Sequence, residues 1–303
     1  MHPAVVAREL GGLATKAQLL LACSERDVNR AVANGSLLHL SRGRYALPHA
    51  REALKVAARL SGTVTHLSAA QCHGWEVANV PDRPWIAVPR NRKVSATGRQ
   101  EAHIIYSSAR GVVTDPARTV LDCARRLPFG EGLAVADSAL RHRHVDQEAL
   151  MAAAETARGS RSDQCRRVAR EANPLAANPL ESMLRGIALD VPGLSVRPQA
   201  EIRLPGFIVH PDLVDERLGL VIEAEGFMFH AATPKRFDRD VERYTQLVVT
   251  GRTVARFTRV QVEECPDYVE HTLTALVAML ERRALVQTCS ARSGTVCSAG
   301  IRR

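Results

Sequence analysis

The chain has 303 residues, enough for two or three domains, and 46% of them are hydrophobic, which is typical of a globular protein with hydrophobic cores. Its 41 Lys and Arg residues outnumber its 32 Asp and Glu residues, so the net charge is +9 and the isoelectric point lies near 9.6. This balance favours a polyanionic partner, nucleic acid before a membrane surface. No apolar run reaches the about 18 residues of a transmembrane helix, and residues 1–12 lack the apolar core of a signal peptide. We therefore expect no membrane association and a cytoplasmic location.

The seven cysteines are scattered along the chain, and no C-x-x-C pair occurs. This spacing argues against a zinc finger and against a disulfide framework. We expect most of these cysteines to be small buried hydrophobic residues.

The first 50 residues predict two short helices followed by a β-hairpin, the plan of a winged helix-turn-helix. The first helix is expected over 14–22 and the second over 25–33. Ser24 is a suitable N-cap for the second helix, and Asn34 followed by Gly35 is a suitable end.

The DNA-binding candidates of this region lie on the second helix and on the hairpin. The surface positions of the helix carry Arg26, Asn29 and Arg30, and the hairpin turn carries Arg42 and Arg44. A helix in the major groove and a basic wing on the phosphate backbone would use these side chains. The alternative is that a helical pair with a hairpin mediates protein contacts.

Residues 1–50 resemble the N-terminal DNA-binding domain of AbiEi-type antitoxins. That family has the segments G-G-x-A-T-x-x-Q-L and R-G-x-Y-x-L-P around the second helix. The matching residues here are Gly11, Gly12, Ala14, Thr15, Gln18, Leu19, Arg42, Gly43, Tyr45, Leu47 and Pro48. The resemblance implies duplex DNA as a partner, and it raises a toxin as a further protein partner.

The middle of the chain, 51–155, predicts a mixed α/β scaffold, with a basic loop at Arg90, Arg92 and Lys93 that could contact the DNA backbone. Residues 156–177 predict a basic linker or helix. We interpret its arginines as solvated surface rather than a phosphate-facing stripe.

A C-terminal domain is expected over 178–284, followed by a disordered tail over 285–303. Asn178, Pro179 and Glu181 predict a helix start with a capping box, which explains Glu181 without catalysis. Strands are expected over 195–203, 208–214 and 253–257, besides the one that ends at Glu225. Further helices are expected over 237–249 and 266–284. The first is amphipathic, and its buried face is expected to carry Phe237, Val241, Tyr244 and Val248.

Acidic side chains gather at one strand end of this domain. Glu223 and Glu225 follow an apolar strand and point to the same side, because side chains alternate along a strand. A hairpin through 215–217 would bring Asp212 close to them. Carboxylates in a small cleft suit a hard divalent cation such as Mg²⁺. The alternative is that these acids face water or pair with arginines.

Residues 178–257 resemble the restriction-endonuclease fold, PD-(D/E)XK, and more closely the domain-of-unknown-function 559 family, which is related to very short patch repair (Vsr) endonucleases. The shared motifs are N-P-x-E-S, P-D-L/F, I-E-A-[DE]-G-x-x-x-H, D-x-x-R-x-x-x-L-x-x-x-G and a strand ending in R-F. The matching residues here are Asn178, Pro179, Glu181, Ser182, Pro211, Asp212, Ile222, Glu223, Ala224, Glu225, Gly226, His230, Asp240, Arg243, Leu247, Gly251, Arg256 and Phe257. We therefore expect an α+β or α/β protein with a restriction-endonuclease-like mixed sheet flanked by helices.

The resemblance implies phosphodiester hydrolysis with Mg²⁺ or Mn²⁺, which would polarise the phosphate and a bound water. Asp212 and Glu223 would hold the metal, His230 would act as general base, and Glu225 would add a ligand or orient His230. Glu181 would support the site by holding a water molecule beside the metal ligands. Lys235 and Arg236 would neutralise the charge of the scissile phosphate.

This sequence departs from the PD-(D/E)XK pattern at Glu225, where those enzymes usually have Lys. The alternative is therefore a non-catalytic DNA-binding regulator, whose degenerate nuclease fold serves dimerisation or partner binding. A third alternative is an antitoxin whose C-terminal domain contacts a toxin. Asp212 and Glu223 both tied to arginines would favour the regulator.

Overall fold

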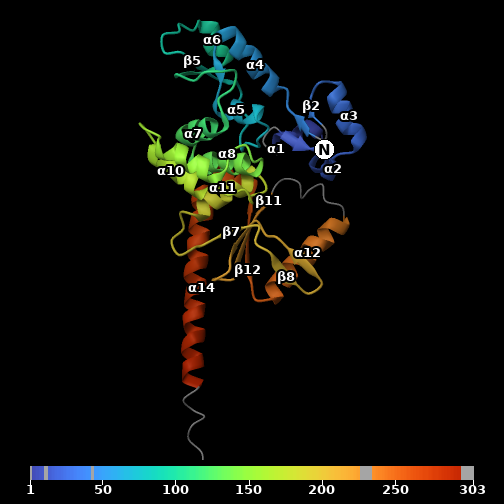
Figure 1. Cartoon of the computed structure of the whole chain (residues 1–303). Helices are drawn as coiled ribbons and strands as arrows, with labels where there is room; N and C mark the ends of the chain where they lie inside the picture. Colours follow the sequence, from blue (N-terminus) through green and yellow to red (C-terminus); the bar gives the residue numbers. More distant parts are fainter. Residues whose placement is uncertain (1, 10–12, 42–43, 226–233, 295–303) are drawn as a thin grey trace, which may run out of the picture. The chain divides into compact units, whose positions relative to one another are not determined.

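The computed structural model describes residues 2–9, 13–41, 44–225 and 234–294 (Figure 1). It is a mixture of helices and strands with mixed sheets, which confirms the α+β class. Two compact units divide the chain: 1–186 with 226–240, and 187–225 with 241–303. Within the described residues, no helix combines the length and apolarity needed to cross a bilayer.

The first unit begins with helices that surround a small antiparallel sheet of strand order β1-β3-β2. Its elements are α1 (Pro3–Glu9), β1 (Leu13–Thr15), α2 (Lys16–Ala22), α3 (Glu25–Ala33), β2 (Leu38–Ser41) and β3 (Arg44–Ala46). Their shared core includes Val6, Leu19, Val28, Leu37 and Tyr45.

Two local predictions here are confirmed and one is wrong. The Ser24 hydroxyl accepts a hydrogen bond from the Asp27 amide at the start of α3, and Asn34 caps its end. Ala14 and Thr15, expected at the start of a helix, lie instead in β1. The reason is tertiary, because Ala14 pairs with Tyr45 of β3 and gains sheet hydrogen bonds.

The middle of the first unit holds a second three-stranded sheet, of order β4-β5-β6, in which β5 and β6 are parallel. Its elements are α4 (His49–Leu60), β4 (Thr63–Val64), α5 (His66–Cys72), β5 (Trp85–Val88), α6 (Ala96–Glu101) and β6 (His103–Tyr106). Helix α6 begins at Ser95, whose hydroxyl accepts from the Gly98 amide.

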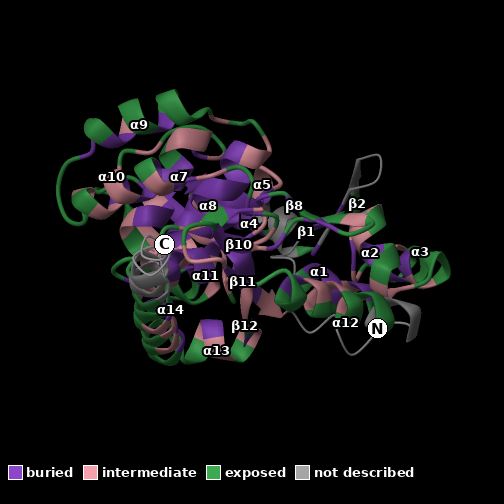
Figure 2. Cartoon of the chain, turned by 90° about the horizontal axis from the view of Figure 1, so that it is seen from below, coloured by how far each residue is buried: buried purple, intermediate pink, exposed green. Residues whose placement is uncertain are grey.

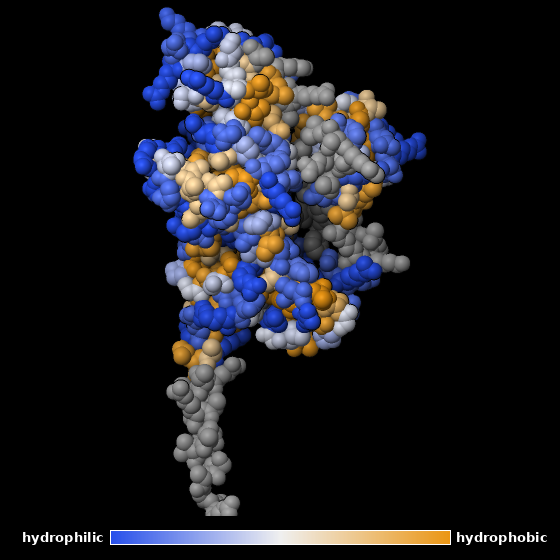
Figure 3. Space-filling view, in the orientation of Figure 1, coloured by the Kyte–Doolittle hydropathy of each residue, from blue (hydrophilic) through white to orange (hydrophobic). Residues whose placement is uncertain are grey.

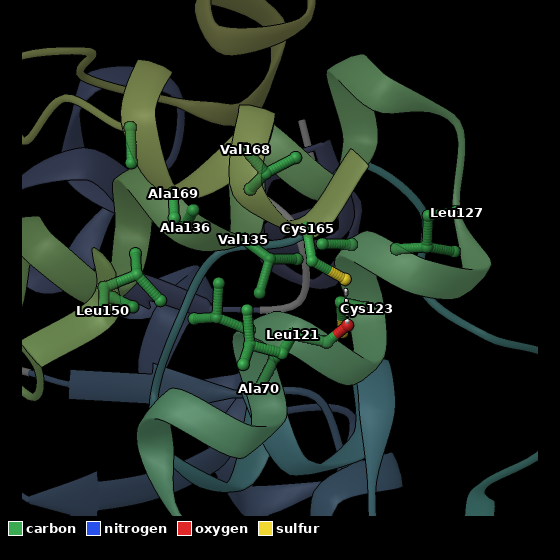
Figure 4. Close-up of a cluster of buried hydrophobic side chains, with 14 of the residues drawn as sticks. Ala70, Leu121, Cys123, Leu127, Val135, Ala136, Leu150, Cys165, Val168 and Ala169 are labelled. Atoms are coloured by element: carbon green, nitrogen blue, oxygen red, sulfur yellow. Dashed lines mark hydrogen bonds between the residues drawn. The ribbon is translucent and has the colours of Figure 1, made fainter. Parts of the chain in front are cut away.

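Helices then dominate the first unit. They are α7 (Pro116–Arg126), α8 (Phe129–Arg141), α9 (Gln147–Glu155), α10 (Ser162–Glu171) and α11 (Pro179–Ala188). Helix α8 is buried continuously from Gly132 to Leu140, and this stretch includes the polar residues Asp137 and Ser138. Leu121, Val135, Leu150 and Val168, from four of these helices, meet in the core that Figure 4 shows.

The second unit is built on a four-stranded sheet of order β12-β11-β10-β7, with a separate hairpin of β8 and β9. Its elements are β7 (Arg197–Pro198), β8 (Ile202–Leu204), β9 (Phe207–Val209), β10 (Leu213–Asp215), β11 (Leu220–Glu225), the part of α12 (Pro234–Val249) that begins at Val241, β12 (Thr253–Thr258), α13 (Arg259–Glu264) and α14 (Pro266–Gly294). Strand β11 is antiparallel to β10 and parallel to β12. Both β10 and the first part of β11 are buried, and Figure 2 shows them in purple.

Three details of this unit differ from expectation. The strands expected over 195–203 and 208–214 are each divided in two, because β8 and β9 leave the main sheet to form their own hairpin around the predicted turn at Gly206. Helix α12 exposes Val241 and Val248, which we expected to be buried, because the helix turns Leu247 inward instead. Residues 285–294, expected to be disordered, continue α14.

Candidate site at the end of strand β11

Asp212 and Glu223 lie opposite each other, Asp212 just before the start of β10 and Glu223 near the end of β11. The antiparallel register pairs Leu213 with Ile222, so Asp212 faces Glu223 one position further along. The Asp212 carboxylate accepts a hydrogen bond from the Ala224 amide at 2.7 Å. The predicted hairpin is therefore correct, and it does bring a third acid to this strand end.

Glu223 is 5% exposed and pairs with an arginine of α12. Its Oε1 accepts a hydrogen bond from Arg243 Nη1 at 3.0 Å. Burial, together with the charges of Asp212 and Glu225, raises the pKa of Glu223 to about 8, although Arg243 and Arg256 act in the opposite direction. We conclude that negative charge and desolvation outweigh the arginines at this position.

Glu225 is held from two elements. Its Oε1 accepts hydrogen bonds from Arg256 Nε at 2.5 Å and from the Tyr244 hydroxyl at 3.0 Å. The hydroxyl of Tyr244 also accepts from Arg243 Nη2 at 2.6 Å, and the guanidinium of Arg256 lies 4.1 Å from the ring centre of Tyr244. Burial is the first cause that raises the pKa of Tyr244, and the nearby Glu223 charge adds to it. A continuous polar network therefore joins β11, α12 and β12.

Sequence reasoning assigned no site role to Arg243, Tyr244 or Arg256. Two of them, Arg243 and Arg256, belong to the motifs matched in the sequence, and that spacing was the available signal. Tyr244 was interpreted only as part of an apolar helix face. Its ring does pack against the core, but its hydroxyl accepts from Arg243 and donates to Glu225.

Glu181 has a structural role at the start of α11, as predicted, but with partners other than the N-cap amide of a capping box. Its carboxylate accepts hydrogen bonds from the Ala177 amide at 2.8 Å and from the Asn178 side chain at 2.6 Å. Asn178 Oδ1 accepts in turn from the Leu180 and Glu181 amides. Glu181 belongs to the first unit, whereas Asp212, Glu223 and Glu225 belong to the second.

Three expected site residues lie wholly or partly outside the described structure. His230 lies outside the described residues. Lys235 and Arg236 lie in the first turn of α12, but their side chains are outside the described part of the structure.

The described carboxylates do not fit a divalent cation as they are arranged. Oxygen donors of Asp and Glu suit Mg²⁺, but Glu223 pairs with Arg243 and Glu225 with Arg256. Among the described residues, no group of three or more His, Cys, Asp or Glu side chains is arranged to hold a metal ion. A cation at Glu223 would have to share the carboxylate with the Arg243 guanidinium, which binds Oε1.

The candidate DNA-contacting residues of α3 are exposed together. Arg26, Asn29 and Arg30 are exposed, while Val28 and Ala31 on the other face are buried. Among the described residues, the ion pair that Arg30 makes is a long, exposed one with Asp27, at 3.6 Å. Arg42 lies outside the described residues, and Arg44 is described only in its backbone, as the first residue of β3.

Comparisons with known proteins find no matching family model and no matching curated protein. Among solved structures, the chain is similar to the crystal structure of the RV2827C protein from Mycobacterium tuberculosis. That likeness has a TM-score of 0.30 and 15% sequence identity, and it covers 67% of this chain and 87% of the other.

Proposed function

We propose that this chain is a DNA-binding regulator, in which the N-terminal residues bind duplex DNA and the nuclease-like sheet is not catalytic. The observation that carries the proposal is the pairing of the strand-end acids, Glu223 with Arg243 and Glu225 with Arg256. In both carboxylates the arginine binds Oε1, an oxygen that would otherwise serve a hydrolytic metal site.

The order of the N-terminal elements supports DNA binding. Two helices, α2 and α3, precede the antiparallel strands β2 and β3, and β1 completes the sheet. This is the order of a winged helix-turn-helix, in which the second of these helices enters the major groove. The exposed Arg26, Asn29 and Arg30 on α3 are residue types that contact phosphates and base edges.

The total charge agrees with a polyanionic partner. The net charge is +9, and a basic protein gains affinity for DNA when its cations release condensed counterions. On the face that Figure 3 draws, hydrophobic residues form separate patches among hydrophilic ones rather than one continuous area.

The resemblance to Vsr-like nucleases keeps metal-dependent endonuclease activity as the competing hypothesis, and contact with a toxin stays a prediction. The raised pKa of Glu223 favours the competitor, because Asp212 and Glu225 both repel its charge. Against it stand the arginines already bound to two of these acids.

A binding and cleavage experiment tests the proposal. The full chain is titrated against a fluorescent duplex of mixed sequence at several salt concentrations, and is also incubated with supercoiled plasmid and Mg²⁺ or Mn²⁺. We expect salt-dependent binding and no cleavage. Arg26→Ala with Arg30→Ala should weaken binding at least about tenfold.

The matched control removes two exposed arginines from α14, by Arg282→Ala with Arg283→Ala. It changes the net charge by the same amount, and we expect duplex affinity close to that of the parent. If both double variants lose the same duplex affinity, the binding depends on net charge and not on the position of the arginines in α3. Metal-dependent plasmid nicking that Asp212→Ala removes would establish the nuclease instead.

A further inference from the structure

The first unit contains a cavity of about 580 Å³ that the proposed function does not use. Its walls come from α7, from the C-terminal end of α9 with the turn after it, from the start of α5 and from β6. The lining residues are His66, Ile105, Asp115, Ala117, Arg118, Leu121, Asp122, Arg125, Ala153, Thr156, Ala157 and Arg158. This volume lies in the range of small-molecule sites, about 300–1,000 Å³.

Three arginines and two aspartates line this cavity, but both aspartates already have partners. Asp122 Oδ1 accepts from Arg118 Nε at 2.8 Å, and its Oδ2 accepts from the Thr65 hydroxyl at 3.1 Å. Asp115 Oδ1 accepts from the Arg118 amide at 2.9 Å as the N-cap of α7. Among the described residues, Asp122 therefore pairs with Arg118, Asp115 keeps its charge and accepts only a backbone N–H, and Arg125 and Arg158 pair with neither acid.

Arg125 and Arg158 make no ion pair with any residue that the structure describes. Arg125 Nη1 donates to the carbonyl oxygens of Arg158 and Ser160, at 2.9 and 2.6 Å. Arg158 Nη1 donates to the carbonyl oxygens of Glu155 and Ala157. These bonds use one terminal nitrogen of each guanidinium, so each keeps further N–H donors in a fixed position.

His66 lies at the inner wall and is only 6% exposed. Its backbone has φ of +51°, a left-handed conformation that is uncommon outside glycine. Its ring stacks on Trp85 at 4.9 Å, and its Nδ1 shares a hydrogen bond of 3.1 Å with the Thr65 hydroxyl. Burial lowers the pKa of His66 to about 4, so a neutral imidazole faces the cavity at neutral pH.

We propose that this cavity binds a small ligand that carries a phosphate group. Arg125 and Arg158 would bind the phosphate, because a guanidinium matches phosphate oxygens with paired donors. Ala117, Leu121 and Ile105 would contact an apolar or ring-shaped remainder. In a DNA-binding regulator, such a ligand would be an effector.

A concave site favours a small ligand over the backbone of a nucleic acid. The cavity walls come from segments that are far apart in the chain, and α7 and α9 contact each other. A duplex backbone needs a broad basic surface along which several phosphates make contact. The experiment therefore measures duplex binding separately from phosphate binding, so that a loss of one can be told from a loss of the other.

The test uses the full chain with inorganic phosphate and adenosine 5′-monophosphate as probes, against sodium chloride of equal ionic strength. Melting temperature is measured as each probe is titrated, and calorimetry gives the dissociation constants. We expect a saturable rise of about 2–4 °C with either probe. The nucleotide should bind about tenfold more tightly than phosphate, because it also covers apolar wall.

The decisive variant is Ala117→Glu, which puts a negative charge into the cavity and leaves the arginine anchors intact. Its control is Ala152→Glu, an exposed position of α9 that does not line the cavity. Ala117→Glu should lose the response and Ala152→Glu should keep it. The proposal is overturned if neither probe raises the melting temperature more than sodium chloride does. It is overturned too if the probes change the melting temperatures of the two variants equally. It is also overturned if Ala117→Glu weakens duplex binding but not phosphate binding.

Discussion

Glu223 and Arg243 form an ion pair at 3.0 Å, yet the pKa of Glu223 is raised to about 8. Arg243 and Arg256 together therefore do not compensate burial and the charges of two neighbouring acids. This imbalance makes the strand end sensitive to pH and to the removal of any single charge.

Glu223→Gln should remove a pH dependence of stability. A carboxyl whose pKa is higher in the folded chain stabilises fully below its unfolded value, and this stabilisation is lost as pH rises through the folded value, about 8. The parent should lose roughly 1 kcal/mol of unfolding free energy between pH 7 and 9. The unfolding free energy of Glu223→Gln should be nearly constant over this pH range. Urea denaturation at each pH measures this, with the exposed Glu216→Gln as control.

Mn²⁺ should leave the melting temperature of the parent unchanged, because the arginines already bind Glu223 and Glu225. Asp212→Asn should be slightly more stable than the parent with or without metal. The asparagine oxygen can still accept from the Ala224 amide, while a repelling charge is gone. Scanning calorimetry with and without Mn²⁺ is the measurement. A rise in the parent that Asp212→Asn abolishes would contradict the non-catalytic proposal.

Arg185→Ala should cost about 3–5 kcal/mol of unfolding free energy, because it leaves Asp137 buried without its cation. Arg185 Nη2 donates to both Asp137 oxygens at 2.8 Å, and the two side chains are 4% and 0% exposed. The control, Arg197→Ala, breaks an exposed pair with Glu216 and should cost under about 1 kcal/mol. If urea denaturation shows equal losses of unfolding free energy in the two variants, burial does not decide how much each ion pair stabilises the fold.

Arg42→Ala with Arg44→Ala should flatten the salt dependence of duplex binding. If both side chains neutralise phosphates, the slope of log affinity against log salt should fall by about 1.8. Fluorescence anisotropy at increasing salt provides the slope. An unchanged affinity and slope would remove the hairpin from the DNA-binding surface.

The sequence by itself determined the features whose partners lie within a few residues. The caps at Ser24 and Asn178 and the turn at Gly206 depend on local hydrogen bonds and backbone conformation, so their residue types are sufficient. The strand-end acids and the β10–β11 hairpin were also readable, because side-chain alternation and a short connection fix their register.

Only the tertiary structure decided what those acids bind. The partners of Glu223 and Glu225 are Arg243, on α12, and Arg256, on β12, which lie 20 and 31 residues further along the chain. Composition had suggested arginine partners in general, but not which ones. Contacts with distant elements also explain why Ala14 lies in a strand and why α12 exposes Val241 and Val248. A residue's neighbours across elements depend on how the whole chain packs, and packing overrides local propensity.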